Sequence, residues 1–140
     1  MRILGTAAPT RTGPERAVGP VWSETFVAPI EVDQHMIAGR VRFAPGARTA
    51  WHSHAKGQYL HVVAGIARMQ SRGESVIEVH AGQTVYTPPG EEHWHGAAPN
   101  SFMEHLALIE LGDDPATSNT WLENVTDEEY ADFAGGEEQR

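Results

Sequence analysis

The sequence predicts an all-β domain that ends in one short helix. Nine prolines and fourteen glycines divide the 140-residue chain into short runs rich in Val, Thr, Tyr and Trp, a pattern typical of β-strands joined by tight turns. With 40% hydrophobic residues, the chain is long enough for one domain with a buried core and short for two. We therefore expect a single small β-barrel or β-sandwich.

The first segment, residues 1–18, mixes Pro, Gly, Thr and Arg without a period. This composition predicts an N-terminal arm, either flexible by itself or held as an edge strand by a neighbour. A single domain is expected over residues 19–134, with no helix needed before residue 120. Within it, Pro and Gly separate five segments with the pattern of strands, at 21–29, 35–46, 57–73, 74–90 and 102–112.

The C-terminal end has the pattern of a helix. Thr126 is a candidate N-cap and Glu129 follows three residues later, which is the spacing of a capping box. Gly135 and Gly136 predict the end of this helix, and residues 135–140 predict a solvated tail.

Composition excludes several classes of function. The formal charge of -9 and only ten scattered Lys and Arg residues argue against a nucleic-acid partner, since phosphate binding needs clustered positive charge. The chain has no cysteine, so it has neither disulfides nor thiolate ligands, and His, carboxylate and amide groups must supply any metal ligand or catalyst. No apolar run is long enough to span a membrane. We expect a cytoplasmic protein with no membrane partner.

Histidines are concentrated in the middle of the chain, with seven of the eight between positions 52 and 105. On a strand, His52 and His54 point to the same face, and Gln58 can rejoin that face after the turn at Gly57. A new strand starting at His93 can bring a third imidazole beside them. Three imidazoles and one oxygen donor suit a divalent first-row metal, although an isolated His-x-His pair is also compatible with a solvated polar face.

Both histidine segments fit longer patterns. Residues 46–65, GARTAWHSHAKGQYLHVVAG, match G-x5-H-x-H-x3-(E/Q)-x6-G, and residues 82–100, GQTVYTPPGEEHWHGAAPN, match G-x5-P-x-G-x2-H. The pair resembles the two motifs of the cupin superfamily. This resemblance implies a cupin-type β-barrel, a jelly roll of two antiparallel sheets, over about residues 20–130. It also implies a metal ion held by His52, His54, Gln58 and His93.

Gln58 differs from the glutamate that is usual at this position of cupins. A neutral amide leaves a divalent ion with a local charge near +2, whereas a carboxylate would reduce it to about +1. The metal is therefore expected to accept anions more strongly. Asn100 comes later than the usual second-motif Asn, and we assign it no role.

A narrower resemblance rests on the segments FAPGARTAWHSHAKGQ, PPGEEHWHGAAP, MEHLAL and WLENVTDEEY. They are similar to small single-domain bacterial cupins related to carboxymuconolactone decarboxylase partners, including manganese-dependent hydroxynitrile lyases. The resemblance implies Mn(II), with Fe(II), Zn(II) and Ni(II) as alternatives, and gives His105 the role of acid and base. Strand parity supports a position inside the barrel, because His105 shares a face with Met103, Ala107 and Ile109. A core histidine bonded to a backbone carbonyl is the alternative.

The remaining pocket candidates come from the same comparison and from parity. Thr49 has the opposite parity to His52, but a bulge could turn its hydroxyl inward, and His95 is either a hydrogen-bond donor behind the ligands or a residue at the pocket mouth. His61 and His80 are expected on the outer face, His35 on the surface, and Trp51 and Trp94 in the core or in subunit contacts. The expected pocket comprises Val41, Phe43, Thr49, His95, Met103, Ala107 and Ile109.

Three functions remain open from the sequence. The first is a metal-dependent lyase of the hydroxynitrile lyase type, acting on a small apolar carbonyl-derived substrate, with the metal as Lewis acid and His105 moving the proton. The second is an Fe(II)-dependent dioxygenase. The third is a small-molecule-binding cupin without catalytic activity. We expect a homodimer or homotetramer, since the exposed edge at residues 21–29 would otherwise invite strand addition.

Overall fold

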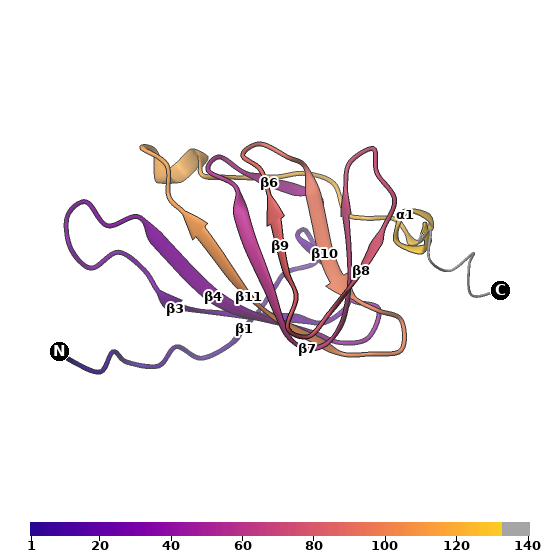
Figure 1. The fold of residues 1–140 in the computed structure, drawn as a ribbon, viewed down its shortest axis with the longest axis horizontal. Coiled ribbons are helices and arrows are strands. Elements are labelled where there is room, and N and C mark those ends of the chain that lie inside the picture. Colours follow the sequence, from indigo (N-terminus) through magenta and orange to yellow (C-terminus); the bar gives the residue numbers. More distant parts are fainter. Residues whose placement is uncertain (133–140) are drawn as a thin grey trace.

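The computed structural model describes residues 1–132 and is mostly β (Figure 1). The predicted stop at Gly135 and Gly136 and the predicted tail over 135–140 lie outside the described residues. The strands are β1 (Thr10–Arg11), β2 (Ala17–Val18), β3 (Val21–Val27), β4 (Met36–Phe43), β5 (Arg48–Thr49), β6 (His52–His54), β7 (Gln58–Ser71), β8 (Ile77–His80), β9 (Thr84–Thr87), β10 (His93–Ala97), β11 (Met103–Glu110) and β12 (Asn119–Trp121).

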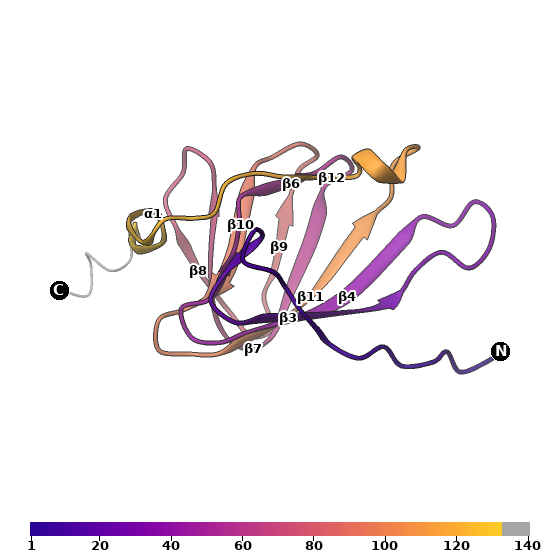
Figure 2. The same ribbon diagram turned by 180° about the vertical axis from the view of Figure 1, so that it is seen from behind.

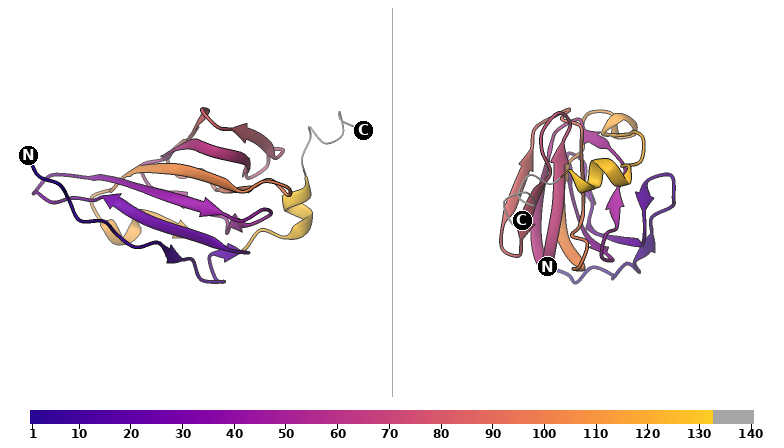
Figure 3. Two further views of the ribbon diagram at one scale, coloured as in Figure 1. Left: turned by 90° about the horizontal axis from the view of Figure 1, so that it is seen from below. Right: turned by 90° about the vertical axis from the view of Figure 1, so that its right-hand side faces the viewer.

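Two curled antiparallel sheets share the long strand β7 and together form a half-barrel (Figure 3). The first half of β7 pairs with β11 and β9, and the second half pairs with β10 and β8. Gly65 lies between the two halves with φ of 77°, and a Cβ there would collide with the carbonyl oxygen of Phe102. A glycine therefore lets β7 pass from one sheet to the other.

The alternation of side chains along the strands creates the core. On β7, Leu60 and Val62 are fully buried while Tyr59 is 53% exposed, which is the period-2 pattern of a strand with one face in the core. The main core cluster consists of Ala17, Val21, Phe43, Ala47, Leu60, Val62, Ala67, Met69, Val79, Ala97 and Met103. A second cluster consists of Trp51, Val76, Trp94, Val125 and Tyr130, so both tryptophans fill core space, one of the two expected alternatives.

The C-terminal helix α1 (Asp127–Ala131) closes the second cluster. Its N-cap Thr126 accepts a hydrogen bond from the backbone of Glu129, whose side chain accepts one from the backbone of Thr126, which confirms the predicted capping box. Tyr130 is buried and donates a 2.6 Å hydrogen bond to the carbonyl of Ala97. The helix is thereby attached to β10.

One local feature differs from the sequence prediction. A short 3-10 helix, η1 (Pro115–Thr117), precedes β12, although no helix was expected before residue 120. Its cause is local, because Asp114 accepts a hydrogen bond from the backbone of Ala116 and Pro115 supplies a fixed φ at the first position. The N-terminal arm pairs with the barrel through β1 and β2, which is the held alternative of the two.

Candidate metal centre

The short strand β6 carries the first two candidate ligands. It lies between β10 and β12, with His52 opposite His93 on β10 and also opposite Trp121 on β12. His54 is opposite Asn119. Because His52 and His54 are two residues apart on one strand, they face the same side, and antiparallel pairing with β10 brings His93 to them from a position about forty residues later in the chain.

Each of these three imidazoles is oriented by an oxygen acceptor at its Nδ1 atom. Because a carbonyl or amide oxygen can only accept, Nδ1 must carry the hydrogen, and the Nε2 lone pair is left to face the interior. Acceptors of this kind fix the ring orientation of metal-binding histidines. The three pairs are His52 with the Ala50 carbonyl at 2.8 Å, His54 with Asn119 Oδ1 at 2.6 Å and His93 with the Glu91 carbonyl at 3.0 Å.

The inward-facing atoms converge. His52, His93 and His95 each offer a ligand atom, and these atoms lie within 4.8 Å of one another. Gln58 Oε1 is 3.0 Å from His93 Nε2, and neither atom carries a hydrogen when His93 is neutral. Two donors that share one ion at about 2.1 Å in octahedral geometry are separated by about 3 Å. The spacing therefore fits ligands of a common cation.

His54 provides a further test of this fit. Its Nε2 atom is buried and has no hydrogen-bond partner in the described part of the protein. A buried polar atom without a partner costs free energy unless a ligand, ion or water satisfies it. Its ring centroid lies 5.1 Å from that of His52 and 5.4 Å from that of His93. The residues present thus fit a divalent metal ion.

Burial keeps the cluster uncharged. Desolvation lowers the pKa of His93 to about 4, with smaller opposing and reinforcing effects from Glu91 and His54. Desolvation also places the pKa values of His52 and His95 well below the ordinary value, and neighbouring histidines lower them further. The pKa of His54 is lowered by the same cause. At neutral pH these rings are therefore unprotonated, the form that a metal requires.

His105 and His95 form a hydrogen-bonded pair behind the cluster. His105 Nε2 lies 2.8 Å from His95 Nδ1, and His95 Nε2 lies 3.3 Å from His52 Nε2. Since His52 Nε2 has a lone pair, His95 Nε2 donates to it, and His95 Nδ1 accepts from His105. His105 is fully buried, and desolvation lowers its pKa to about 3.

A cavity of about 400 Å³ opens onto this cluster. Its lining includes His52, His54, Gln58 and His95. His105 is not among the lining residues. Among the other residues expected at the pocket, Val41, Thr49 and Ala107 also line the cavity, and Thr49 Oγ1 accepts a hydrogen bond from the backbone of His95 at 3.2 Å.

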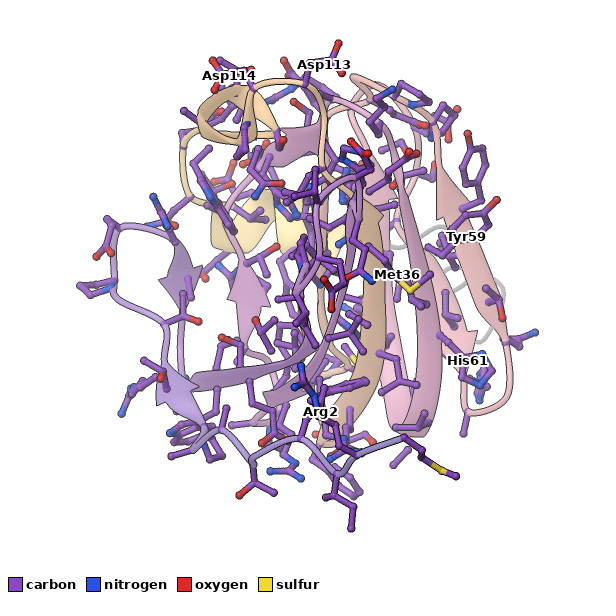
Figure 4. The ribbon with its side chains drawn as sticks, turned by 90° about the vertical axis from the view of Figure 1, so that its left-hand side faces the viewer. Arg2, Met36, Tyr59, His61, Asp113 and Asp114 are labelled. Carbon is purple, nitrogen blue, oxygen red and sulfur yellow. The ribbon has the colours of Figure 1, made fainter. Side chains whose placement is uncertain are left out.

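Three other expected pocket residues lie elsewhere. Phe43 and Met103 pack in the core, where the Phe43 ring lies 5.3 Å from that of His105. Ile109 lines a second cavity of about 530 Å³, together with Met36 and Tyr59. Met36 and Tyr59, both labelled in Figure 4, are 61% and 53% exposed. Ile109 lies outside the histidine-lined cavity because it is near the end of β11, at the edge of the barrel.

A Cupin domain model matches residues 39–107. An (R)-mandelonitrile lyase from Granulicella tundricola is 51% identical over 106 residues, which cover 75% of this chain and 77% of that protein. The chain is a cupin.

Solved structures agree with this family. A cupin-like protein from Thermotoga maritima superposes with a TM-score of 0.82 at 32% identity, over 96% of this cupin and 99% of that chain. A predicted oxalate decarboxylase from the same organism superposes with a TM-score of 0.68 over 78% of this cupin and 100% of that chain. At 21% identity, the second comparison supports the fold alone.

Several residues at the site of this cupin were not expected from the sequence. Asn119 orients His54, and the Trp121 ring stacks on His52 with centroids 4.6 Å apart. Their signal in the sequence was weak, because β12 is only three residues long and lies sixty-five positions from its partner. The histidines expected elsewhere are outside the cluster: His35 and His80 are exposed, and His61 bonds Thr84 at the outer side of β7 (Figure 4).

No helix in the described part of the chain has the length and hydrophobicity needed to cross a membrane.

Proposed function

We propose that this cupin is a metal-dependent hydroxynitrile lyase, which cleaves a cyanohydrin into a carbonyl compound and hydrogen cyanide. The observation that carries the proposal is the paired arrangement of a neutral metal-binding cluster and the His95–His105 hydrogen bond at one cavity. The relative that is 51% identical is an (R)-mandelonitrile lyase. Cyanohydrin cleavage removes one proton from the hydroxyl and releases cyanide, and a Lewis acid can assist it. Both the proton-transfer group and the Lewis acid have candidates here.

The metal would be held by four neutral donors: His52, His54, Gln58 and His93. When bound, a divalent ion supplies Lewis acidity and a positive charge that the ligand set does not reduce. We propose Mn(II) as the ion, from the resemblance to manganese-dependent lyases. Nitrogen and oxygen donors without thiolate also suit Fe(II), Zn(II) and Ni(II).

Proton transfer is assigned to His95 together with His105. With a metal ion held by His52 Nε2, that atom would no longer accept from His95, and the pair would adopt the other tautomer, in which His95 Nδ1–H donates to His105 Nε2 across the 2.8 Å contact. His95 lines the cavity, so its Nε2 can then accept the proton of the substrate hydroxyl while its Nδ1 proton moves to His105 Nε2. Low pKa values keep both rings neutral and able to accept at neutral pH. Cyanide is a stronger base than imidazole, so the proton then passes to the leaving cyanide. His95 is thus the residue that contacts substrate, and His105 is its proton-holding partner.

The walls of the cavity favour a small, partly apolar substrate. Val21, Val41 and Ala107 contribute apolar side chains to the cavity lining, against which the body of an aldehyde or ketone can be buried. Thr49 places a hydroxyl beside His95. It can hydrogen-bond the substrate oxygen without adding charge.

The test is cleavage of mandelonitrile by protein loaded with Mn(II), followed as benzaldehyde release with and without oxygen. A lyase works equally well without oxygen, whereas a dioxygenase does not. His105→Ala should keep the metal and lose about 100-fold or more in turnover, the usual contribution of a positioned acid-base group. His61→Ala, on the outer side of β7, is the control. Inactivity of the wild type toward all cyanohydrins would refute the lyase assignment.

We also propose that the protein is a cytoplasmic homodimer or homotetramer. Support comes from β3, where Trp22 is 37% exposed and Phe26 is 46% exposed near the edge of a sheet, since large apolar side chains at an edge are normally covered. Light scattering at micromolar concentration tests the assembly. A mass of 15.3 kDa, that of one chain, would contradict it.

A further inference from the structure

The segment from Thr10 to Arg16 forms part of the cavity wall beside the histidine cluster. Its backbone is fixed at several points: β1 pairs with β3, Asn124 Nδ2 donates to the carbonyl of Pro14 at 2.8 Å, and the backbone N–H of Ala50 donates to the carbonyl of Arg16 at 2.8 Å. In Figure 2 this indigo segment crosses the barrel and turns back near β6 and β10. The rim of the site therefore includes the turn at residues 12–16, whose backbone is fixed by hydrogen bonds.

Arg16 is placed over the site by stacking. Its guanidinium carbon lies 5.0 Å from the centre of the Trp121 ring, and that ring stacks on His52 with centroids 4.6 Å apart and planes at 26°. A cation–π contact followed by a ring stack keeps the guanidinium within about 10 Å of the His52 ring. The Trp121 ring thus separates the Arg16 guanidinium from the candidate metal ligand His52.

The guanidinium donors of Arg16 have no partner among residues 1–132. In the described chain its side chain makes neither an ion pair nor a hydrogen bond, although it lines the cavity. A guanidinium that stacks through its face keeps its N–H groups at the edge, where they can bind a carboxylate in bidentate geometry. By contrast, four other arginines are already paired with carboxylates: Arg40, Arg42, Arg48 and Arg72.

The charges of the rim add to this effect. Arg11 also lines the cavity and stacks on Trp22, and Glu15 is the one carboxylate among the lining residues. Neither of these residues makes an ion pair in the described chain. The rim is therefore net positive on a protein with a formal charge of -9. Within a Debye length of about 8 Å, this local positive charge attracts anionic ligands.

We propose that Arg16 selects substrates that carry a carboxylate at the end remote from the reacting carbon. The reacting oxygen would face the histidine cluster, the body of the molecule would contact Val21, Val41 and Ala107, and the carboxylate would bind the edge of the Arg16 guanidinium. The inference rests on the proposed function only for the chemistry of the reacting end. Recognition of the carboxylate depends on Arg16 and the charge of the rim, and not on the reaction at the other end.

The experiment compares 4-formylbenzoate with benzaldehyde, which differ by one carboxylate. Calorimetric titration should be done on both Mn(II)-loaded and metal-free protein. The wild type should bind 4-formylbenzoate about tenfold more tightly than benzaldehyde in either form, as expected for a charge-assisted bidentate contact. Arg16→Met should abolish this preference and leave benzaldehyde binding unchanged. Arg16→Lys should retain part of it, and Glu15→Gln should increase it by removing the opposing charge.

The control is Arg72→Met. Arg72 also stacks on a tryptophan, at 4.1 Å from the Trp51 ring, but it is bonded to Glu92 and Glu123 and does not line the cavity. This variant should bind both aldehydes as the wild type does. Equal affinity of the wild type for the two aldehydes, or a preference that survives in Arg16→Met, would overturn the inference.

The two proposals fail separately. Cleavage of mandelonitrile without any carboxylate preference would leave the lyase function standing and remove the role of Arg16. Carboxylate binding that depends on Arg16 in a protein inert toward cyanohydrins would leave the binding role standing and remove the lyase function.

Discussion

The metal-free protein should lose stability steeply in mild acid, because five buried histidines surround the site. Desolvation lowers the pKa of His93 to about 4 and that of His105 to about 3. His52, His54 and His95 also have lowered pKa values for the same reason. An unfolded histidine titrates near pH 6.5. The unfolded chain therefore binds more protons than the folded one as soon as the pH falls below about 6.5.

The sign and size follow from proton linkage. A group that is harder to protonate in the folded state contributes stability that is present above its unfolded pKa and is lost as the pH falls towards its folded pKa. For a histidine shifted from about 6.5 to about 4, the loss between pH 7 and pH 5 is about 2 kcal/mol. Because the five rings interact, their contributions do not simply add. One such contribution is already a large part of the stability of a small domain.

Urea unfolding of chelator-treated protein at pH 7, 6 and 5 measures this effect. His93→Asn should reduce the difference between pH 7 and pH 5 by about 2 kcal/mol, since it removes one titrating ring. His61→Gln, outside the buried cluster, should leave the difference unchanged. A metal-free protein with the same free energy of unfolding at pH 7 and pH 5 would refute the reasoning. Saturating Mn(II) should raise the free energy of unfolding at all three pH values, since the ion binds the folded state.

Three further predictions concern the ligand set. His52→Ala or His93→Ala should remove most of the bound metal, because each deletes one of four donors, and full metal content by elemental analysis would contradict the site. Gln58→Glu should retain the metal and weaken azide and cyanide binding, since a carboxylate lowers the charge of the site, and unchanged anion affinity would exclude that argument. Asn119→Leu should weaken metal binding about 10- to 100-fold by releasing the His54 ring, whereas wild-type affinity would show that the 2.6 Å contact does not orient the ligand.

The sequence allowed much of the fold to be predicted, because the relevant physics is local. Tight turns at Gly and Pro divided the chain into strands, parity placed His52 and His54 on one face, and the capping box located α1. The start of a strand at His93 was also predicted and is confirmed. Each of these features depends on residues within a few positions of one another.

Features that depend on distant pairing were harder to predict. Strand β12 and the two-residue strands β1 and β2 have too few residues to show a period, and their positions come from pairing with β6, β3 and β5. Residues of β12 and of the turn between β1 and β2 nevertheless complete the site, since Asn119 bonds His54 and Arg16 lies over Trp121. Non-local pairing is fixed by the whole fold, and a single sequence carries little of that information.

The hydrogen-bonded pair of His95 and His105 could not be predicted from the sequence either. Parity placed His105 inside the barrel, His95 was expected either behind the ligands or at the pocket mouth, and resemblance assigned proton transfer to His105. The structure places His95 between His105 and the cavity, so one ring contacts substrate space and the other is fully buried behind it. A single exposed imidazole would exchange its proton with water, whereas the buried partner holds the proton in reserve at a site that water does not reach. Since the metal ligands are neutral and the pair is neutral, a proton taken from the substrate adds one positive charge near a cation. That charge is relieved only when the proton leaves with the anionic product, which couples proton return to cyanide release.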